Sequence, residues 1–143
     1  MKEFNKEGLE PWEFELVARY PLIFLEGAEP GECNLRYGFE FGYGWKQLAE
    51  DFASMASKLV EHLRTTTQPD AFVHSFIWKE KFGSLTWQGD DNLVEPFGVL
   101  LRAYQSHLEA KSERTCEVCG KWAKIRPGGW RKALCDEHFD RAA

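Results

Sequence analysis

Four side chains near the end of the chain are of types that bind metal ions. Two residues separate Cys116 from Cys119, which is followed by Gly120, and 15 residues after Gly120 Cys135 is paired in the same way with His138. Cys-x-x-Cys and Cys-x-x-His pairs with this separation are typical of a tetrahedral Zn²⁺ site. Four protein ligands close the coordination shell, so we predict a structural Zn²⁺ ion without a catalytic open position.

The residues around these ligands predict a particular zinc fold. Residues 121–126 and 130–134 favour two strands, and Pro127, Gly128 and Gly129 between them favour a turn. Residues 135–138 favour a helix start, where side chains three positions apart face the same way. The order of knuckle, hairpin and helix is typical of a treble-clef zinc finger. A module of about 30 residues has no core of its own, so we expect its folding to be coupled to metal binding.

Two other uses of these residues fit less well. A thioredoxin-type redox pair begins a helix, whereas Cys119 is followed by a glycine and a predicted hairpin. Nucleases of the HNH type also use a treble clef and take their catalytic histidine from the hairpin, yet residues 121–134 contain no histidine. The remaining histidines, His62, His74 and His107, are scattered, and no nucleophile, base and orienting group occur in a suitable pattern. We therefore expect no enzymatic activity.

The predicted hairpin is rich in basic and aromatic residues. The candidates for a surface that contacts a partner or nucleic acid are Lys121, Lys124, Arg126, Trp130, Arg131 and Lys132, together with Trp122. Lysine and arginine interleaved with tryptophan suit a nucleic-acid or acidic protein surface. The alternative is a solvated hairpin whose tryptophans pack on the rest of the protein.

Length and composition predict one core and one small appendage. The chain has 143 residues, of which 43% are hydrophobic and 15% aromatic. We expect an α+β body over residues 1–113, with helices on a small antiparallel sheet, and a zinc module over residues 114–143 docked on it. The polar N-terminus and the lack of a long apolar run lead us to expect a cytoplasmic protein without a membrane span.

Charge is distributed unevenly between the two predicted parts. The net charge is −5, but residues 114–143 hold seven Lys and Arg against four Asp and Glu. The acidic body repels phosphate backbones, so nucleic-acid binding would be confined to the basic end. A protein partner, basic where it meets the body, is easier to accommodate.

Hydrophobic periodicity places the elements of the body. Residues 11–20 favour a helix that starts at Pro11, although a strand is an alternative, and residues 35–41 alternate as a strand. The period changes to that of an amphipathic helix over residues 44–65. Residues 72–79 and 84–88 favour a hairpin, with Trp78 and Val73 on opposite faces, and a last helix runs from the Asp- and Asn-rich segment after Gly89 to about residue 112. Cys33 lies in a loop composition over residues 26–34, and we expect a free thiol.

Three motifs in this order resemble a group of small, mostly uncharacterised bacterial and phage proteins. Residues 38–45 read GFEFGYGW, residues 79–85 read KEKFGSL, and residues 115–120 and 134–138 read TCEVCG and LCDEH. The resemblance covers about residues 12–140 and implies the fold and the zinc site. Tyr43 stands where that pattern has an acidic residue, so no role of that acid carries over.

The setting of that group in phages and mobile elements implies a role in biological conflict. A small acidic protein with many aromatic residues and no catalytic pattern is typical of an inhibitor, in which aromatic side chains anchor an interface. We therefore expect an immunity or counter-defence protein that binds a toxin or effector stoichiometrically. The alternative is a nucleic-acid-associated zinc protein that uses the basic, tryptophan-containing hairpin.

Overall fold

The computed structural model describes residues 9–24 and 39–142, and it has the α+β architecture predicted from the sequence. The elements in chain order are α1 (Pro11–Arg19), α2 (Pro21–Phe24), η2 (Tyr43–Trp45), α3 (Lys46–Arg64), β1 (Val73–Lys81), β2 (Ser84–Asp91), α4 (Phe97–Ser112), β3 (Lys124–Arg126), β4 (Lys132–Leu134) and α5 (Asp136–Ala142). The strands form two separate antiparallel pairs, β1 with β2 and β3 with β4.

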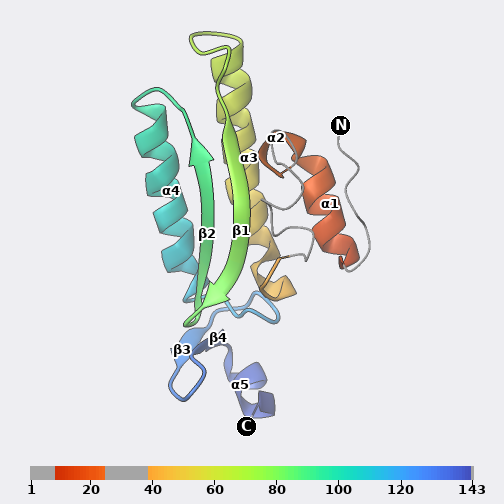
Figure 1. Cartoon of the computed structure of the whole chain (residues 1–143). Helices are drawn as coiled ribbons and strands as arrows, with labels where there is room; N and C mark the ends of the chain where they lie inside the picture. Colours follow the sequence, from red (N-terminus) through yellow and green to blue (C-terminus); the bar gives the residue numbers. More distant parts are fainter. Residues whose placement is uncertain (1–8, 25–38, 143) are drawn as a thin grey trace.

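The long β1–β2 hairpin is covered by helices. Figure 1 shows α3 and α4 side by side along the hairpin, while α2 lies beside β1 and α1 lies next to α2. The short β3–β4 hairpin and α5 sit at one end of this layered body, next to the turn that joins β1 to β2. The body therefore has two layers, and the last part of the chain is attached to its end.

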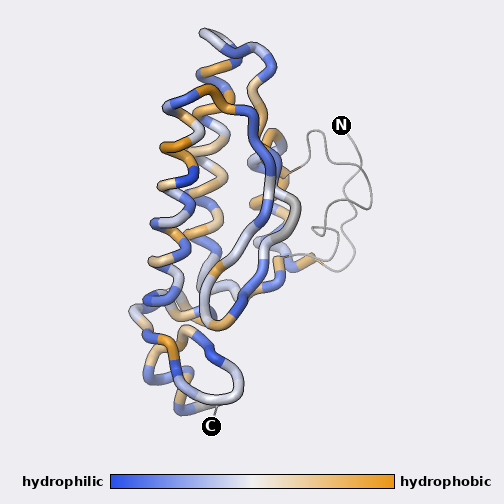
Figure 2. Tube along the Cα trace, turned by 60° about the vertical axis from the view of Figure 1, so that its left-hand side comes forward, coloured by the Kyte–Doolittle hydropathy of each residue, from blue (hydrophilic) through white to orange (hydrophobic). Residues whose placement is uncertain are grey.

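Helix α3 forms because its apolar residues repeat with a helical period, as the sequence predicts for residues 44–65. Its buried face consists of Leu48, Ala49, Phe52, Ala53, Ala56, Ser57, Val60 and Leu63. Figure 2 shows the corresponding alternation of hydrophobic and hydrophilic residues along the helical traces. Burial of this stripe, more than helix propensity, stabilises the helix in the fold.

The core is built around Trp78 of β1, which is 1% exposed. Trp87 of β2 lies opposite it in the strand register, and the two rings stack with centroids 4.9 Å apart. Among the described residues, the rings of Phe24, Phe39, Phe41 and Phe52 also contact Trp78. An aromatic cluster of this kind holds the hairpin, α3 and the N-terminal segments together.

The predicted strict alternation along β1 is wrong, because a bulge interrupts it. Val73, Ser75 and Trp78 are all buried, although strict alternation would place Val73 and Ser75 on the face opposite to Trp78. The register of the strand pair shifts between Ser75 and Ile77, where β1 has one residue more than β2. This extra residue reverses which side chains face the core on its two sides. Gly89 permits the distortion, since a Cβ there would lie 2.2 Å from the His74 carbonyl oxygen.

The predicted helix after Gly89 also begins later than expected. Strand β2 continues to Asp91, and α4 starts only at Phe97. Asn92 serves the intervening loop instead, because its Oδ1 accepts a 2.7 Å hydrogen bond from the N–H of Phe72. Polar residues that suit a helix start thus stabilise a strand end and a loop here.

The helix predicted for residues 11–20 is confirmed as α1, whereas the strand predicted for residues 35–41 lies mostly outside the described residues. At its described end Glu40 forms an isolated parallel bridge with Lys79 of β1. The predicted loop over residues 26–34, including Cys33, lies outside the described part of the chain.

Candidate metal centre

The first two candidate ligands lie in a tight turn of the backbone. The N–H of Gly120 donates a 2.8 Å hydrogen bond to the Cys116 carbonyl, and the N–H of Cys116 donates a 2.8 Å bond to the Lys121 carbonyl. Gly120 has a φ of 81°, a left-handed conformation that favours glycine. This turn directs the Cys116 and Cys119 sulfurs to the same side.

The other two ligands are placed by the β3–β4 hairpin and α5, as the sequence predicts. Cys135 directly follows β4, and its carbonyl accepts the N–H of Phe139 at 2.9 Å in the first turn of α5. His138 lies three positions further along this turn, so its ring returns to the Cys135 sulfur. Knuckle, hairpin and helix therefore follow one another as in a treble clef.

The four ligand atoms form a compact cluster. The atoms offered by Cys116, Cys119, Cys135 and His138 all lie within 4.8 Å of one another. The Cys119 and Cys135 sulfurs are 3.8 Å apart, and Nδ1 of His138 lies 3.6 Å from the Cys116 sulfur. A tetrahedral ion with metal–sulfur bonds of about 2.3 Å requires sulfur–sulfur distances of about 3.8 Å. The cluster thus has the dimensions of one tetrahedral metal site.

The surroundings of the sulfurs favour a thiolate at Cys116. Burial alone would raise the pKa of the Cys116 thiol, but the N–H groups of Cys135, Cys119 and Val118 bring this pKa down to about 6. For Cys119, burial raises the pKa and the neighbouring sulfurs add to the effect, against the lowering influence of the Lys121 N–H. Metal binding requires thiolates, and a bound cation would remove the repulsion between them.

Arg126 supports the cluster from inside the module. It is only 8% exposed, its Nε donates a 3.0 Å hydrogen bond to the Leu134 carbonyl, and a terminal nitrogen lies 2.7 Å from Asp136. Its guanidinium also lies over the Phe139 ring, 4.7 Å from the centroid. The Arg126 hydrogen bond lowers the pKa of the Asp136 carboxyl. Arg126 thereby fixes α5, which carries His138, to the hairpin.

The Cys₃His cluster is joined to the body through two glycines and a glutamate. The N–H of Gly44 donates a 2.8 Å hydrogen bond to the Glu117 carbonyl, and the Glu117 side chain accepts the N–H of Gly42 at 3.1 Å. A Cβ on Gly44 would lie 2.0 Å from the Cys116 carbonyl oxygen, which real side chains do not allow. These glycines let the start of α3 lie directly against the backbone of the ligand turn.

An ion-pair network forms a second connection. The Lys132 ammonium lies 3.2 Å from Glu80 of β1 and 3.4 Å from Glu117. Burial would lower the pKa of Lys132, but the charges of Glu117 and Glu80 outweigh it, so the pKa is raised. Lys132 therefore stays charged and links β4 to both the body and the ligand turn.

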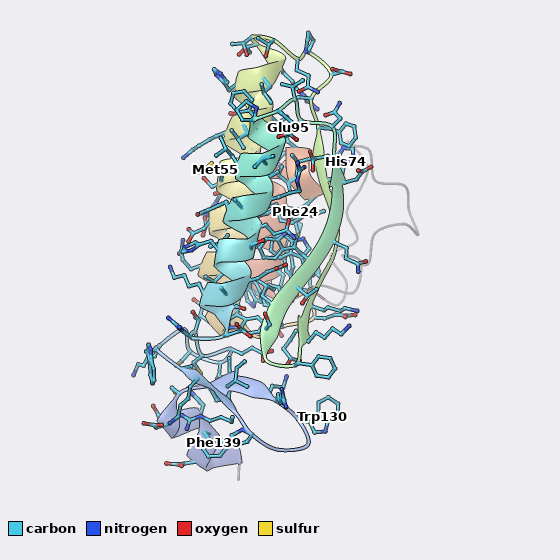
Figure 3. All side chains as sticks on the ribbon, turned by 90° about the vertical axis from the view of Figure 1, so that its left-hand side faces the viewer. Phe24, Met55, His74, Glu95, Trp130 and Phe139 are labelled. Atoms are coloured by element: carbon cyan, nitrogen blue, oxygen red, sulfur yellow. The ribbon has the colours of Figure 1, made fainter. Side chains whose placement is uncertain are left out.

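The structure divides the predicted basic surface into two groups. Lys121, Lys124 and Arg131 are exposed, whereas Arg126 is buried and Lys132 is half-buried in its ion pairs. Trp122 is 69% exposed and Trp130 is 83% exposed. The alternative in which these tryptophans pack on the body is therefore wrong, and Figure 3 shows Trp130 projecting from the loop between β3 and β4.

The remaining histidines do not join the cluster. His62 and His107 are exposed on α3 and α4, and the His74 ring stacks on Phe72 with centroids 4.6 Å apart.

Three residues that the sequence did not indicate, Glu117, Gly44 and Phe82, lie where the body meets the C-terminal module. Glu117 lies between two cysteine ligands, where its burial and its contact with Gly42 have no local signal. Gly44 belongs to residues 42–45, GYGW, and the sequence pattern there indicates only the end of a strand and the start of a helix. Phe82 has a positive φ of 54° in the two-residue turn between β1 and β2. In the sequence only the following Gly83 indicates such a turn, and it does so weakly.

Fold and site together define an α+β protein with a C-terminal Cys₃His cluster whose geometry is compatible with a metal ion. Comparisons with protein-family models, with curated proteins and with solved structures gave no match. Within the described residues, no helix has the length and apolar character needed to cross a membrane.

Proposed function

We propose that this protein acts by stoichiometric protein–protein binding, as an immunity or counter-defence protein that neutralises a toxin or effector. The observation that carries the proposal is the exposure of large aromatic side chains at the metal-binding end: Trp130 is 83%, Phe82 is 70% and Trp122 is 69% exposed. Exposed aromatic residues on a rigid scaffold are typical anchors of protein interfaces. Their burial against a partner would supply the binding free energy.

We further propose that the Cys₃His cluster holds one structural Zn²⁺ ion. Three thiolates and an imidazole are soft ligands that suit Zn²⁺ and do not suit Mg²⁺ or Ca²⁺. The ion keeps the loop of Trp130 in a fixed position relative to the body, which is a condition for a rigid binding surface. Free thiols of this kind persist in a reducing compartment, so we place the protein in the cytoplasm.

The test is suppression of toxicity in cells. A toxin encoded beside this protein is expressed with it and without it, and growth and complex formation are measured. We expect growth to be rescued and a 1:1 complex to be purified, with rescue lost when Cys116 and Cys119 are both changed to serine. Absence of rescue for every neighbouring toxin, together with pull-downs that recover no protein, would contradict the proposal.

The second candidate function is nucleic-acid binding, which is favoured by the exposed cations Lys121, Lys124 and Arg131 beside two exposed tryptophans. Under this alternative a gel shift should weaken with salt and with reversal of charge at Lys124 and Arg131. Charge reversal at Arg126 is not a clean test, because this side chain is buried within the module.

A further inference from the structure

The turn between β1 and β2 contains a residue that the fold itself does not favour. Phe82 and Gly83 are its two central residues, with φ values of 54° and 85°. Hairpin turns with positive φ at both positions favour Asn or Asp followed by Gly, because a bulky side chain is strained in the left-handed region. The Phe82 ring does not gain core burial in return, since it is 70% exposed. An exposed aromatic side chain at a strained position is a feature expected of a binding site.

Phe82 forms one wall of a groove between the body and the metal module. The groove has a volume of about 350 Å³ and is lined by Glu80, Lys81, Phe82, Gly129, Trp130 and Arg131. Figure 3 shows Trp130 at the end of the molecule next to the β1–β2 turn. Two exposed aromatic side chains from distant parts of the sequence thus face one hollow.

The two walls are held at a fixed separation. A Cβ on Gly83 would contact the Ile125 side chain at 3.3 Å, so the turn lies against β3. The ion pair between Lys132 and Glu80 ties β4 to β1 at the same place. The groove is therefore a preformed feature of the folded protein, which reduces the entropy lost on binding.

The charge of the groove is positive. Of the charged residues that line it, the one carboxylate, Glu80, is paired with Lys132, whereas the two cations, Lys81 and Arg131, are exposed and form no ion pair within the described residues. The Lys81 ammonium lies 5.8 Å from the centre of the Phe82 ring, so one cation and one aromatic face adjoin each other. Such a surface complements a ligand that combines carboxylates with an apolar group.

We infer that this groove binds an acidic peptide segment of the protein partner, which is an inference that depends on the proposed function. An aliphatic or aromatic side chain of the segment packs against Phe82 and Trp130, and neighbouring Asp or Glu carboxylates pair with Lys81 and Arg131. The expectation of a basic partner therefore does not extend to this end of the molecule.

A peptide suits the groove better than a nucleic acid does. Grooves for single-stranded nucleic acid follow the backbone with many cations, whereas this groove offers two exposed cations, Lys81 and Arg131. Two cations match the few carboxylates of a short acidic segment.

The test uses random peptides of about 12 residues, displayed on phage and selected on the full-length, zinc-loaded protein. We expect selected sequences to carry Asp or Glu next to an aromatic or aliphatic residue. Binding of a synthetic peptide with a selected sequence, measured by fluorescence anisotropy, should weaken about tenfold or more in Phe82→Asn and in Trp130→Ala. The double charge reversal Lys81→Glu with Arg131→Glu should also abolish binding.

Trp122→Ala is the matched control, because Trp122 is an exposed tryptophan of the same module that does not line the groove. The proposal is overturned if no acidic motif is selected, or if Phe82→Asn binds the selected peptide as tightly as the wild type. It is also overturned if oligothymidylate displaces the peptide and itself binds more tightly in a manner that depends on Phe82 and Trp130.

The same variants separate this inference from the proposed function. If toxin suppression is intact in Phe82→Asn and Trp130→Ala, the protein is an inhibitor that uses another surface, and the groove proposal fails alone. If acidic peptides bind the groove but no toxin is suppressed, the groove proposal stands and the inhibitor function fails.

Discussion

The indole N–H of Trp45 donates a 2.7 Å hydrogen bond to the backbone carbonyl of Thr115, a residue 70 positions away. Trp45 is completely buried at the start of α3, and Thr115 directly precedes the first candidate ligand, Cys116. One side chain therefore connects the core of the body to the backbone that carries the candidate ligands. This connection makes the position of the Cys₃His cluster sensitive to residues of the body.

Trp45→Phe should destabilise the protein by about 1–3 kcal/mol, because the Thr115 carbonyl loses its donor and the smaller ring leaves space. The measurement is the free energy of unfolding in urea. Trp122→Phe controls for the loss of an exposed indole and should change this free energy little. An unchanged urea midpoint for Trp45→Phe would show that the hydrogen bond is dispensable.

Gly44→Ala should destabilise the protein by about 1–3 kcal/mol or more, since its Cβ would overlap the Cys116 carbonyl oxygen and force the ligand turn away. We expect a lower thermal midpoint and weaker metal retention in a competition with a chelator. Gly129→Ala is the matched control, because a Cβ at Gly129 meets nothing within 4 Å. Equal midpoints for the two variants would mean that the close approach at Gly44 does not constrain the fold.

Metal removal should unfold the C-terminal module selectively. We expect elemental analysis to find one Zn²⁺ per chain, and chelation to make residues 114–142 sensitive to trypsin, since the module has only a small apolar cluster of its own. His138→Ala should show the same sensitivity without chelator. His107→Ala, at an exposed position on α4, should behave as the wild type, and a protease-resistant His138→Ala module would contradict the metal site.

Glu13 should make stability depend on pH in the weakly acidic range. Burial raises the pKa of the Glu13 carboxyl, against the lowering effect of the N–H groups of Glu10 and Phe39 that it accepts at 2.9 and 3.2 Å. Because the pKa is higher in the folded state, the stabilising contribution is fully present below the unfolded value of about 4.3 and is lost as pH rises through the raised pKa.

The measurement is the free energy of unfolding between about pH 4 and pH 7 for the wild type and Glu13→Gln. We expect the wild type to lose stability relative to the variant as pH rises through this range. Glu15→Gln, at an exposed position on α1, controls for the change in net charge. A difference between wild type and Glu13→Gln that is constant with pH would refute the prediction.

Phe82→Asn should stabilise the fold by about 0.5–1 kcal/mol, because asparagine tolerates the left-handed backbone and fits this turn. The gain is measured by urea denaturation of the zinc-loaded protein. Phe82→Ala removes the ring but keeps the strained conformation, so it should give little or no gain. A lower free energy of unfolding for Phe82→Asn would mean that the Phe82 ring stabilises the folded state, which would contradict the prediction.

The amphipathic stripe of α3 and the four candidate metal ligands could be predicted from the sequence because their signals are local. Ligands three positions apart, whether in a tight turn or at a helix start, converge whatever surrounds them. The hairpin that contains Trp78 and Trp87 was predictable for the same reason, since its strands are joined by a two-residue turn.

The sequence by itself thus determined the α+β class, the main elements and the candidate metal ligands. Only the tertiary structure decided that Arg126 is internal, that Trp130 is exposed and that Gly44 touches the backbone of Cys116. It also placed Phe82 across a groove from the loop of Trp130. The physical reason is that burial and close approach depend on which distant segments pack together. The spacing of residues along the chain does not predict those contacts.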